Sequence, residues 1–141
     1  MLSSAQRSEL ESRARYALGN TFRLENIEPA CGGGISKALK LTDSTGCVFA
    51  KLRPASDLAM FKAEAEGLEA LSRCEAWKVP SVLALGEAEA QAFLLLEWLD
   101  LSPIHSEAEA RRAGEALASL HRYTGDHFGW PHDNFIGNTP Q

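Results

Sequence analysis

The sequence has no long hydrophobic run. Its longest apolar stretch, Ala92 to Leu96, is far too short to cross a bilayer, which requires about 20 such residues. The first residues, Met-Leu-Ser-Ser-Ala-Gln-Arg, contain no apolar core of the kind found in signal peptides. We therefore expect no membrane partner and no secretory leader.

Cysteine and positive charge are also scarce. Cys31, Cys47 and Cys74 form no C-x-x-C pair, and three cysteines cannot all be bridged to one another. A reducing, cytoplasmic location is the simplest expectation. The net charge of −5 gives no basic surface, which argues against nucleic acid or an anionic membrane as a partner.

What remains is an ordinary globular composition, with 141 residues, 45% of them hydrophobic and 23% charged. Two capping boxes, Ser3-x-x-Gln6 and Ser106-x-x-Glu109, predict helices that end near Leu18 and Arg122. A third helix is expected from Ser56 to Arg73, capped by Ser56 or Asp57. Strands are expected at 22–29, 35–42, 47–53, 81–86 and 92–98. The tail from Asp126 to Gln141 has no helical or strand period.

Lys51 and Glu64 are the most informative residues. Lys51 ends the apolar strand that starts at Cys47, and Glu64 projects from within the apolar arc of the helix that follows. A carboxylate on a core-facing stripe is costly unless it is paired, and Lys51 is the nearest cation on a preceding strand. A strand lysine held by a helix glutamate grips the α- and β-phosphates of ATP in kinase-type folds. Two solvated charges are the common alternative for any such pair.

The order of motifs favours the kinase interpretation. Gly32, Gly33 and Gly34 lie between two expected strands, one hairpin before the lysine strand. Glycines allow a backbone to approach a ligand closely and to aim its N–H groups at anionic oxygens, although a flexible turn is the other interpretation. The connection Asp43-Ser-Thr-Gly46 has the composition of a tight turn.

The chain resembles the fructosamine kinases, also called ketosamine-3-kinases, over nearly its whole length. The resemblance is carried by Phe61-Lys-Ala-Glu-Ala-Glu-Gly-Leu-Glu-Ala-Leu71, Lys78-Val-Pro80, Leu95-Leu-Glu-Trp-Leu99, Leu117-Ala-Ser-Leu-His121, Phe128-Gly-Trp130 and Asn134-Phe-Ile-Gly-Asn-Thr-Pro-Gln141. It implies a protein-kinase-like α+β fold close to that of aminoglycoside and choline kinases. The implied N-lobe is a five-stranded antiparallel sheet with one packed helix, here preceded by an extra N-terminal helix and followed by a hinge and the first C-lobe helix.

The resemblance also implies a function. The family transfers the γ-phosphate of ATP to the sugar 3-hydroxyl of ketosamines on free or protein-bound lysine, and the unstable product then releases the lysine. By resemblance, Gly32 to Ser36 cover the phosphates, Lys51 contacts them and Glu64 orients Lys51. Glu97, Trp98 and Leu99 form the hinge that meets the adenine. His121 is expected to be a core histidine rather than a catalytic one.

The aspartate that orients the acceptor hydroxyl, and the Mg²⁺ ligands, are expected from a His-Gly-Asp-Leu-type motif and a following Asp, neither of which occurs before Gln141. We therefore expect an ATP-binding N-lobe at 1–98, a hinge at 99–106 and the start of a C-lobe at 107–141, with the catalytic residues beyond Gln141. Two alternatives stay open, a kinase for an amino-sugar or choline-like alcohol and a catalytically incomplete nucleotide-binding domain.

Overall fold

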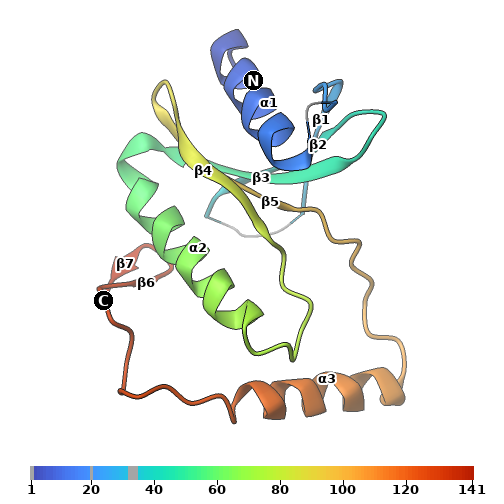
Figure 1. Cartoon of the computed structure of the whole chain (residues 1–141), viewed down its shortest axis with the longest axis vertical. Coiled ribbons are helices and arrows are strands. Elements are labelled where there is room, and N and C mark those ends of the chain that lie inside the picture. Colours follow the sequence, from blue (N-terminus) through green and yellow to red (C-terminus); the bar gives the residue numbers. More distant parts are fainter. Residues whose placement is uncertain (1, 20, 32–34) are drawn as a thin grey trace.

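The computed structural model describes residues 2–19, 21–31 and 35–141. In this part of the chain a five-stranded antiparallel sheet, in the order β1-β2-β3-β5-β4, lies between two helices (Figure 1). Helix α1 covers one face of the sheet and α2 the other, because each helix shares a separate cluster of buried residues with it. The predicted α+β fold with its antiparallel sheet is confirmed.

The five strands agree with the sequence expectation in number and order. The first is shorter than predicted, and the others differ by a few residues at their ends. Adjacent strands pair antiparallel throughout, and the Asp43 turn closes the β2–β3 hairpin as expected, with its carboxylate accepting from the N–H groups of Thr45 and Gly46. The observed bounds are β1 Asn26–Pro29, β2 Lys37–Thr42, β3 Cys47–Pro54, β4 Val82–Ala88 and β5 Gln91–Glu97.

Strand β5 is buried on both faces, as its continuous apolar run predicted. Phe93 and Leu95 pack into the cluster on the α1 side, whereas Leu94 and Leu96 pack on the α2 side. This alternation follows from the two-residue period of a strand. It also assigns the faces of β3, because residues opposite one another in register point to the same side. Lys51 pairs in register with Leu94 and therefore faces α2.

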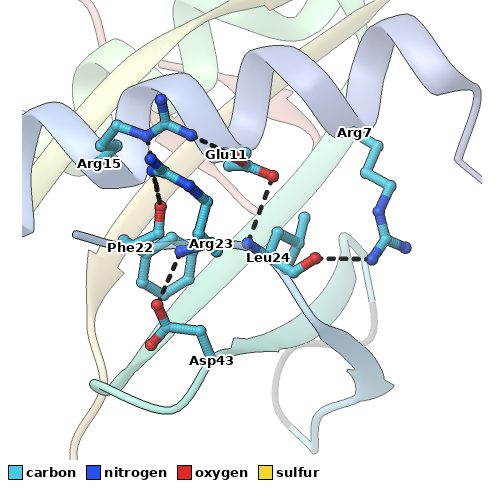
Figure 2. A network of polar contacts seen from close by, with 7 residues as sticks. All are labelled: Arg7, Glu11, Arg15, Phe22, Arg23, Leu24 and Asp43. Carbon is cyan, nitrogen blue, oxygen red and sulfur yellow. Dashed lines mark hydrogen bonds and ion pairs between the residues drawn. The ribbon is translucent and has the colours of Figure 1, made fainter. Parts of the chain in front are cut away.

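Helix α1, Ser4–Leu18, begins with the predicted capping box at Ser3 and ends at Gly19, where φ is +93°. Polar contacts fix it to the segment that leads into β1 (Figure 2). Arg7 donates to the carbonyl of Leu24 at 2.8 Å, and Glu11 accepts from the Leu24 N–H at 3.3 Å. Leu24 lies outside the sheet, and backbone groups without a strand partner need other hydrogen bonds. The side chains of α1 supply these bonds to its carbonyl and its N–H.

Helix α2, Leu58–Ser72, is preceded by a short 3₁₀ turn, Ala55–Asp57. Asp57, one of the two residues expected as the cap, occupies the N-cap position, but its side chain makes no capping hydrogen bond. It accepts instead from Arg53, at 2.8 Å from Nε. Phe61 and Ala65 are buried against the sheet, whereas Leu71 near the end of the helix is 43% exposed.

Helix α3, Glu107–Leu120, lies apart from the sheet and begins with the second predicted capping box at Ser106. His121 forms the C-cap of this helix and is exposed, so the expectation of a core histidine is wrong. The reason is that α3 buries no residue in this structure, which leaves its C-terminal turn no core to enter.

The tail contains a structure that its sequence pattern did not predict. β6, Phe135–Ile136, and β7, Thr139–Pro140, pair antiparallel across a two-residue turn. Gly137, the first turn residue, has φ +62°, and Gly-Asn is a favoured two-residue hairpin loop. The Gly137-Asn138 pair was therefore the available signal. Among the described residues, no helix is long and apolar enough to span a membrane.

Candidate functional site

Lys51 and Glu64 form the expected pair. The Nζ atom of Lys51 lies 2.7 Å from Oε1 and 2.6 Å from Oε2 of Glu64, so the carboxylate holds the ammonium with both oxygens. The two side chains are 18% and 33% exposed, which leaves them partly shielded from water. An ammonium has three N–H donors, and Glu64 can occupy two of them. The third remains free to donate to a ligand, since no other polar partner is recorded for Lys51 within the described residues.

The pair borders a groove of about 470 Å³. Ser36, at the end of the glycine run, lines the same groove and is partly buried. The other predicted loop residues, Gly32, Gly33 and Gly34, lie outside the described residues. The groove is further lined by residues of α2 and of the β6–β7 hairpin, which lies beside α2 in Figure 1. It thus joins residues 35–36, strand β3, helix α2 and the C-terminal hairpin beside the Lys51 ammonium.

Arg53 is a member of this site that sequence reasoning missed. It lies two residues after Lys51 on β3 and therefore points to the same face of the sheet. Its guanidinium contacts Asp57, the carbonyl of Ile35 and the side chain of Asn138. The spacing of Arg53 and Lys51 was a usable signal for a shared face, and Asp57 four residues later was a nearby partner for the guanidinium.

A second groove, of about 730 Å³, lies at the predicted hinge. Glu97, Trp98 and Leu99 line it together with the apolar residues Phe49 and Leu96. Phe49 precedes Lys51 by two residues on β3, so one face of this strand borders both grooves in succession. A largely apolar groove therefore lies next to the groove that contains the Lys51 ammonium.

Polar contacts hold the side chain of Trp98 in place. Its indole Nε1 donates to Asp100 at 2.8 Å, and the ammonium of Lys40 lies 4.3 Å from its ring centroid. The ring of Phe49 packs beside it with 6.2 Å between centroids. The aromatic ring is therefore oriented on three sides.

Glu97 fixes the entry to the hinge. Its carboxylate accepts from Lys78 Nζ at 2.7 Å and from the backbone N–H of Ser81 at 3.1 Å. The hydrogen bond from Lys78 and then that from the Ser81 N–H hold the pKa of Glu97 below its usual value. Its side chain is thus committed to the segment that leads into β4, and its backbone N–H donates to the Ser81 carbonyl at 2.9 Å.

Comparison with known sequences decides the family. The sequence profile described as fructosamine kinase matches residues 7–141 of this chain. The chain belongs to the fructosamine kinase family. The resemblance found in the sequence motifs is therefore confirmed.

Named relatives in the fructosamine kinase family agree with this assignment. The probable ketoamine kinase of Synechocystis sp. is 37% identical over 124 residues, which cover 87% of this chain and 42% of that protein. A probable ketoamine kinase of Vibrio cholerae is 31% identical over 125 residues, covering 88% and 43%. The chain thus spans less than half the length of these relatives.

Two crystal structures of proteins named as fructosamine-3-kinases share the fold. The one from Haemophilus somnus has a TM-score of 0.83 at 27% identity, covering 94% of this chain and 45% of that one. The one from Thermobifida fusca has a TM-score of 0.71 at 28% identity, covering 93% and 44%. Both similarities cover more than nine-tenths of this chain, so the fold of this fructosamine kinase family member is that of solved relatives.

Proposed function

We propose that this chain is the ATP-gripping part of a ketosamine kinase. The observation that carries the proposal is the bidentate Lys51–Glu64 pair, set between an apolar groove at the hinge and a groove at the end of the glycine run. Glu64 fixes the ammonium, and the ammonium balances charge on the α- and β-phosphates. Trp98 and Leu99 border the adenine. The division into an N-lobe at 1–98, a hinge at 99–106 and the start of a C-lobe at 107–141 belongs to the same proposal.

The residues present fit ATP, which supplies the γ-phosphoryl group. Lys51 has a third N–H donor that Glu64 does not occupy. The groove at the hinge is lined largely by apolar side chains, as an adenine ring requires. We propose that the ligands of Mg²⁺, and the aspartate that orients the acceptor hydroxyl, come from sequence beyond Gln141. Within this chain, Lys51, Glu64 and Ser36 hold and orient phosphate, and none of them is assigned proton transfer.

As acceptor we propose the 3-hydroxyl of a ketosamine, either free or on a glycated protein lysine, with removal of the adduct as the outcome. Family membership and the names of the relatives support this class. A cytoplasmic setting is proposed from the three cysteines, all of which are free thiols in the structure. An amino-sugar or choline-like acceptor would place the protein in a sister family.

Isothermal titration with ATP tests the proposal directly. Lys51→Met should weaken ATP binding by at least about tenfold while the melting temperature stays close to that of the wild type, because both side chains keep some contact with water and such ion pairs contribute little to stability. Glu64→Gln should weaken binding through the same interaction, so the double variant should be far less than additive. Lys62→Met, on the exposed side of α2, is the matched control. Unchanged ATP affinity in Lys51→Met would refute the assignment.

Transfer of labelled phosphate tests the acceptor. The 141-residue chain should phosphorylate none of fructose-lysine, choline or an aminoglycoside, because the hydroxyl-orienting carboxylate is not assigned within it. Such positioned groups commonly contribute factors of about 10² to 10⁴ each. A protein extended to the length of the relatives should act on fructose-lysine. Robust turnover by the 141-residue chain would show that its catalytic residues are misassigned.

A further inference from the structure

Arg53 makes more side-chain contacts with distant segments than the proposed chemistry accounts for. Its Nη1 donates to the carbonyl of Ile35 at 3.0 Å, and its Nη2 donates to Oδ1 of Asn138 at 3.0 Å. Nε and Nη2 both reach Oδ2 of Asp57, at 2.8 and 2.7 Å. The side chain is only 10% exposed. A guanidinium has five N–H donors, and these contacts use four of them.

The partners of Arg53 are the segments that surround the Lys51–Glu64 pair. Ile35 directly follows the glycine run, and Ser36 after it lines the groove. Asp57 directly precedes α2, the helix that carries Glu64. Asn138 lies in the turn of the β6–β7 hairpin, whose Phe135 and Gly137 line the same groove. Each of the three contacts therefore reaches one wall of the groove.

Geometry explains why an arginine is needed here. The planar fork of a guanidinium donates in several fixed directions at once, whereas an ammonium on a flexible stem acts as a compact point charge. A lysine at position 53 could keep an ion pair with Asp57, but it could not reach Ile35 and Asn138 in the same conformation. The contacts with the loop and the hairpin depend on the shape of the side chain, not on its charge.

We infer that Arg53 is a positioning residue for the phosphate chain of the nucleotide. It sets Ile35, the start of α2 and the tip of the hairpin at fixed positions around Lys51. The inference rests on the proposed function, since it assumes that the groove at Lys51 takes phosphate. It predicts a selective defect: loss of the Arg53 fork weakens binding of phosphate groups and leaves binding of the adenine ring at the hinge groove unchanged.

Paired titrations with ATP and with adenosine test this inference on the 141-residue chain. Arg53→Lys should raise the Kd for ATP by about tenfold or more, with the Kd for adenosine within about twofold of the wild type. Asn138→Ala, which removes only the contact with the hairpin, should raise the Kd for ATP by a smaller factor, again without effect on adenosine. Arg112→Lys, on the exposed surface of α3, is the matched control. Circular dichroism melting of each variant verifies folding, and Asn138→Ala keeps the test intact if Arg53→Lys does not fold.

The outcomes separate this inference from the proposal beneath it. Equal weakening of ATP and adenosine would make Arg53 a purely structural residue and overturn the inference, as would unchanged affinity for both. In either case Lys51→Met still reports on ATP binding by itself. A wild-type chain that binds neither ligand would instead remove the proposed function, and the inference with it. Selective loss of ATP affinity in Arg53→Lys supports both.

Discussion

The segments before and after Glu97 are built from similar local signals but reach different degrees of burial. Every fully buried hydrophobic residue of the described chain lies between Leu10 and Leu96, and none lies in 98–141. Helices α1 and α3 both begin with complete capping boxes, at Ser3 and Ser106. Yet α1 buries Leu10 and Ala14 against the sheet, whereas α3 buries no residue.

The comparison separates helix formation from helix stabilisation. A capping box suffices to place the start of a helix in the sequence, as both cases show. Stability in water comes mainly from tertiary packing of the apolar face. We therefore expect the N-terminal region to unfold cooperatively and the C-terminal region to respond locally. Matched substitutions in the two regions should therefore have unequal effects.

The largest expected difference comes from a pair of phenylalanines. Phe93→Ala should lower the free energy of unfolding by about 3–5 kcal/mol, because Phe93 is 0% exposed and its removal leaves a cavity in the sheet. Phe128→Ala should change it by less than about 0.5 kcal/mol, since Phe128 is fully exposed. Urea denaturation followed by circular dichroism measures both. Equal effects would mean that the two regions share one core.

Two glycines sharpen the same contrast. A Cβ added at Gly86 would lie 2.9 Å from the ring of Phe93, so Gly86→Ala should destabilise the chain by about 1–3 kcal/mol. A Cβ at Gly114 would meet nothing within 4 Å, and alanine is the better helix former there. Gly114→Ala should therefore increase helical signal, by up to about 1 kcal/mol of helix stability. Destabilisation by Gly114→Ala would reveal a close neighbour of α3.

Removing the capping side chain from either helix should cost about 1 kcal/mol of stability. Ser3→Ala should lower the melting temperature of the whole N-terminal region, because Ser3 also donates to Glu89 at 2.7 Å and so links α1 to the β4–β5 connection. Ser106→Ala should reduce helical signal at low temperature without moving the main transition. Amide hydrogen exchange resolves the two regions, and faster exchange of β5 in Ser106→Ala would contradict the comparison.

The smallest expected effects concern the dependence of stability on pH. The pKa of Glu97 is lowered, first by its hydrogen bond from Lys78, and that of Glu109 first by the backbone N–H of His105. A lowered folded-state pKa gives stability that is present above the unfolded value and is lost as pH falls through the folded one. Glu97→Gln should therefore lower the main melting temperature at neutral pH but not in acid. Glu109→Gln should affect only the α3 signal, over the same pH range, and a main transition that shifts with Glu109→Gln would couple the regions.

Local patterns predicted much of this structure. Capping boxes, the apolar run of β5 and the tight turn at Asp43 act through neighbouring residues, so a single sequence contains what is needed to identify them. The Lys51–Glu64 contact was also accessible, because an apolar helix face that contains a carboxylate requires a cation nearby. Lys51 was the nearest cation on a preceding strand, and the order of the motifs then favoured the kinase interpretation.

Features that depend on distant contacts were missed or mistaken. Arg53 meets Ile35 across 18 positions and Asn138 across 85, and no periodic pattern encodes such contacts. His121 was expected in a core, but its burial depends on what packs against α3, and α3 buries no residue. Asp57 has the right position for a cap, yet the Arg53 guanidinium takes its carboxylate. In each case a tertiary partner decided between two locally acceptable arrangements.

The strand order has a consequence for how the chain is made. β5 pairs with β3, although β4 and a whole helix separate them in sequence. During synthesis, one edge of β3 therefore stays unpaired until residues near Glu97 have left the ribosome. An unpaired strand edge is a template for association with other chains. Nascent chains that stop before β5 should therefore depend most on chaperones. That dependence should end once β5 has left the ribosome and paired with β3.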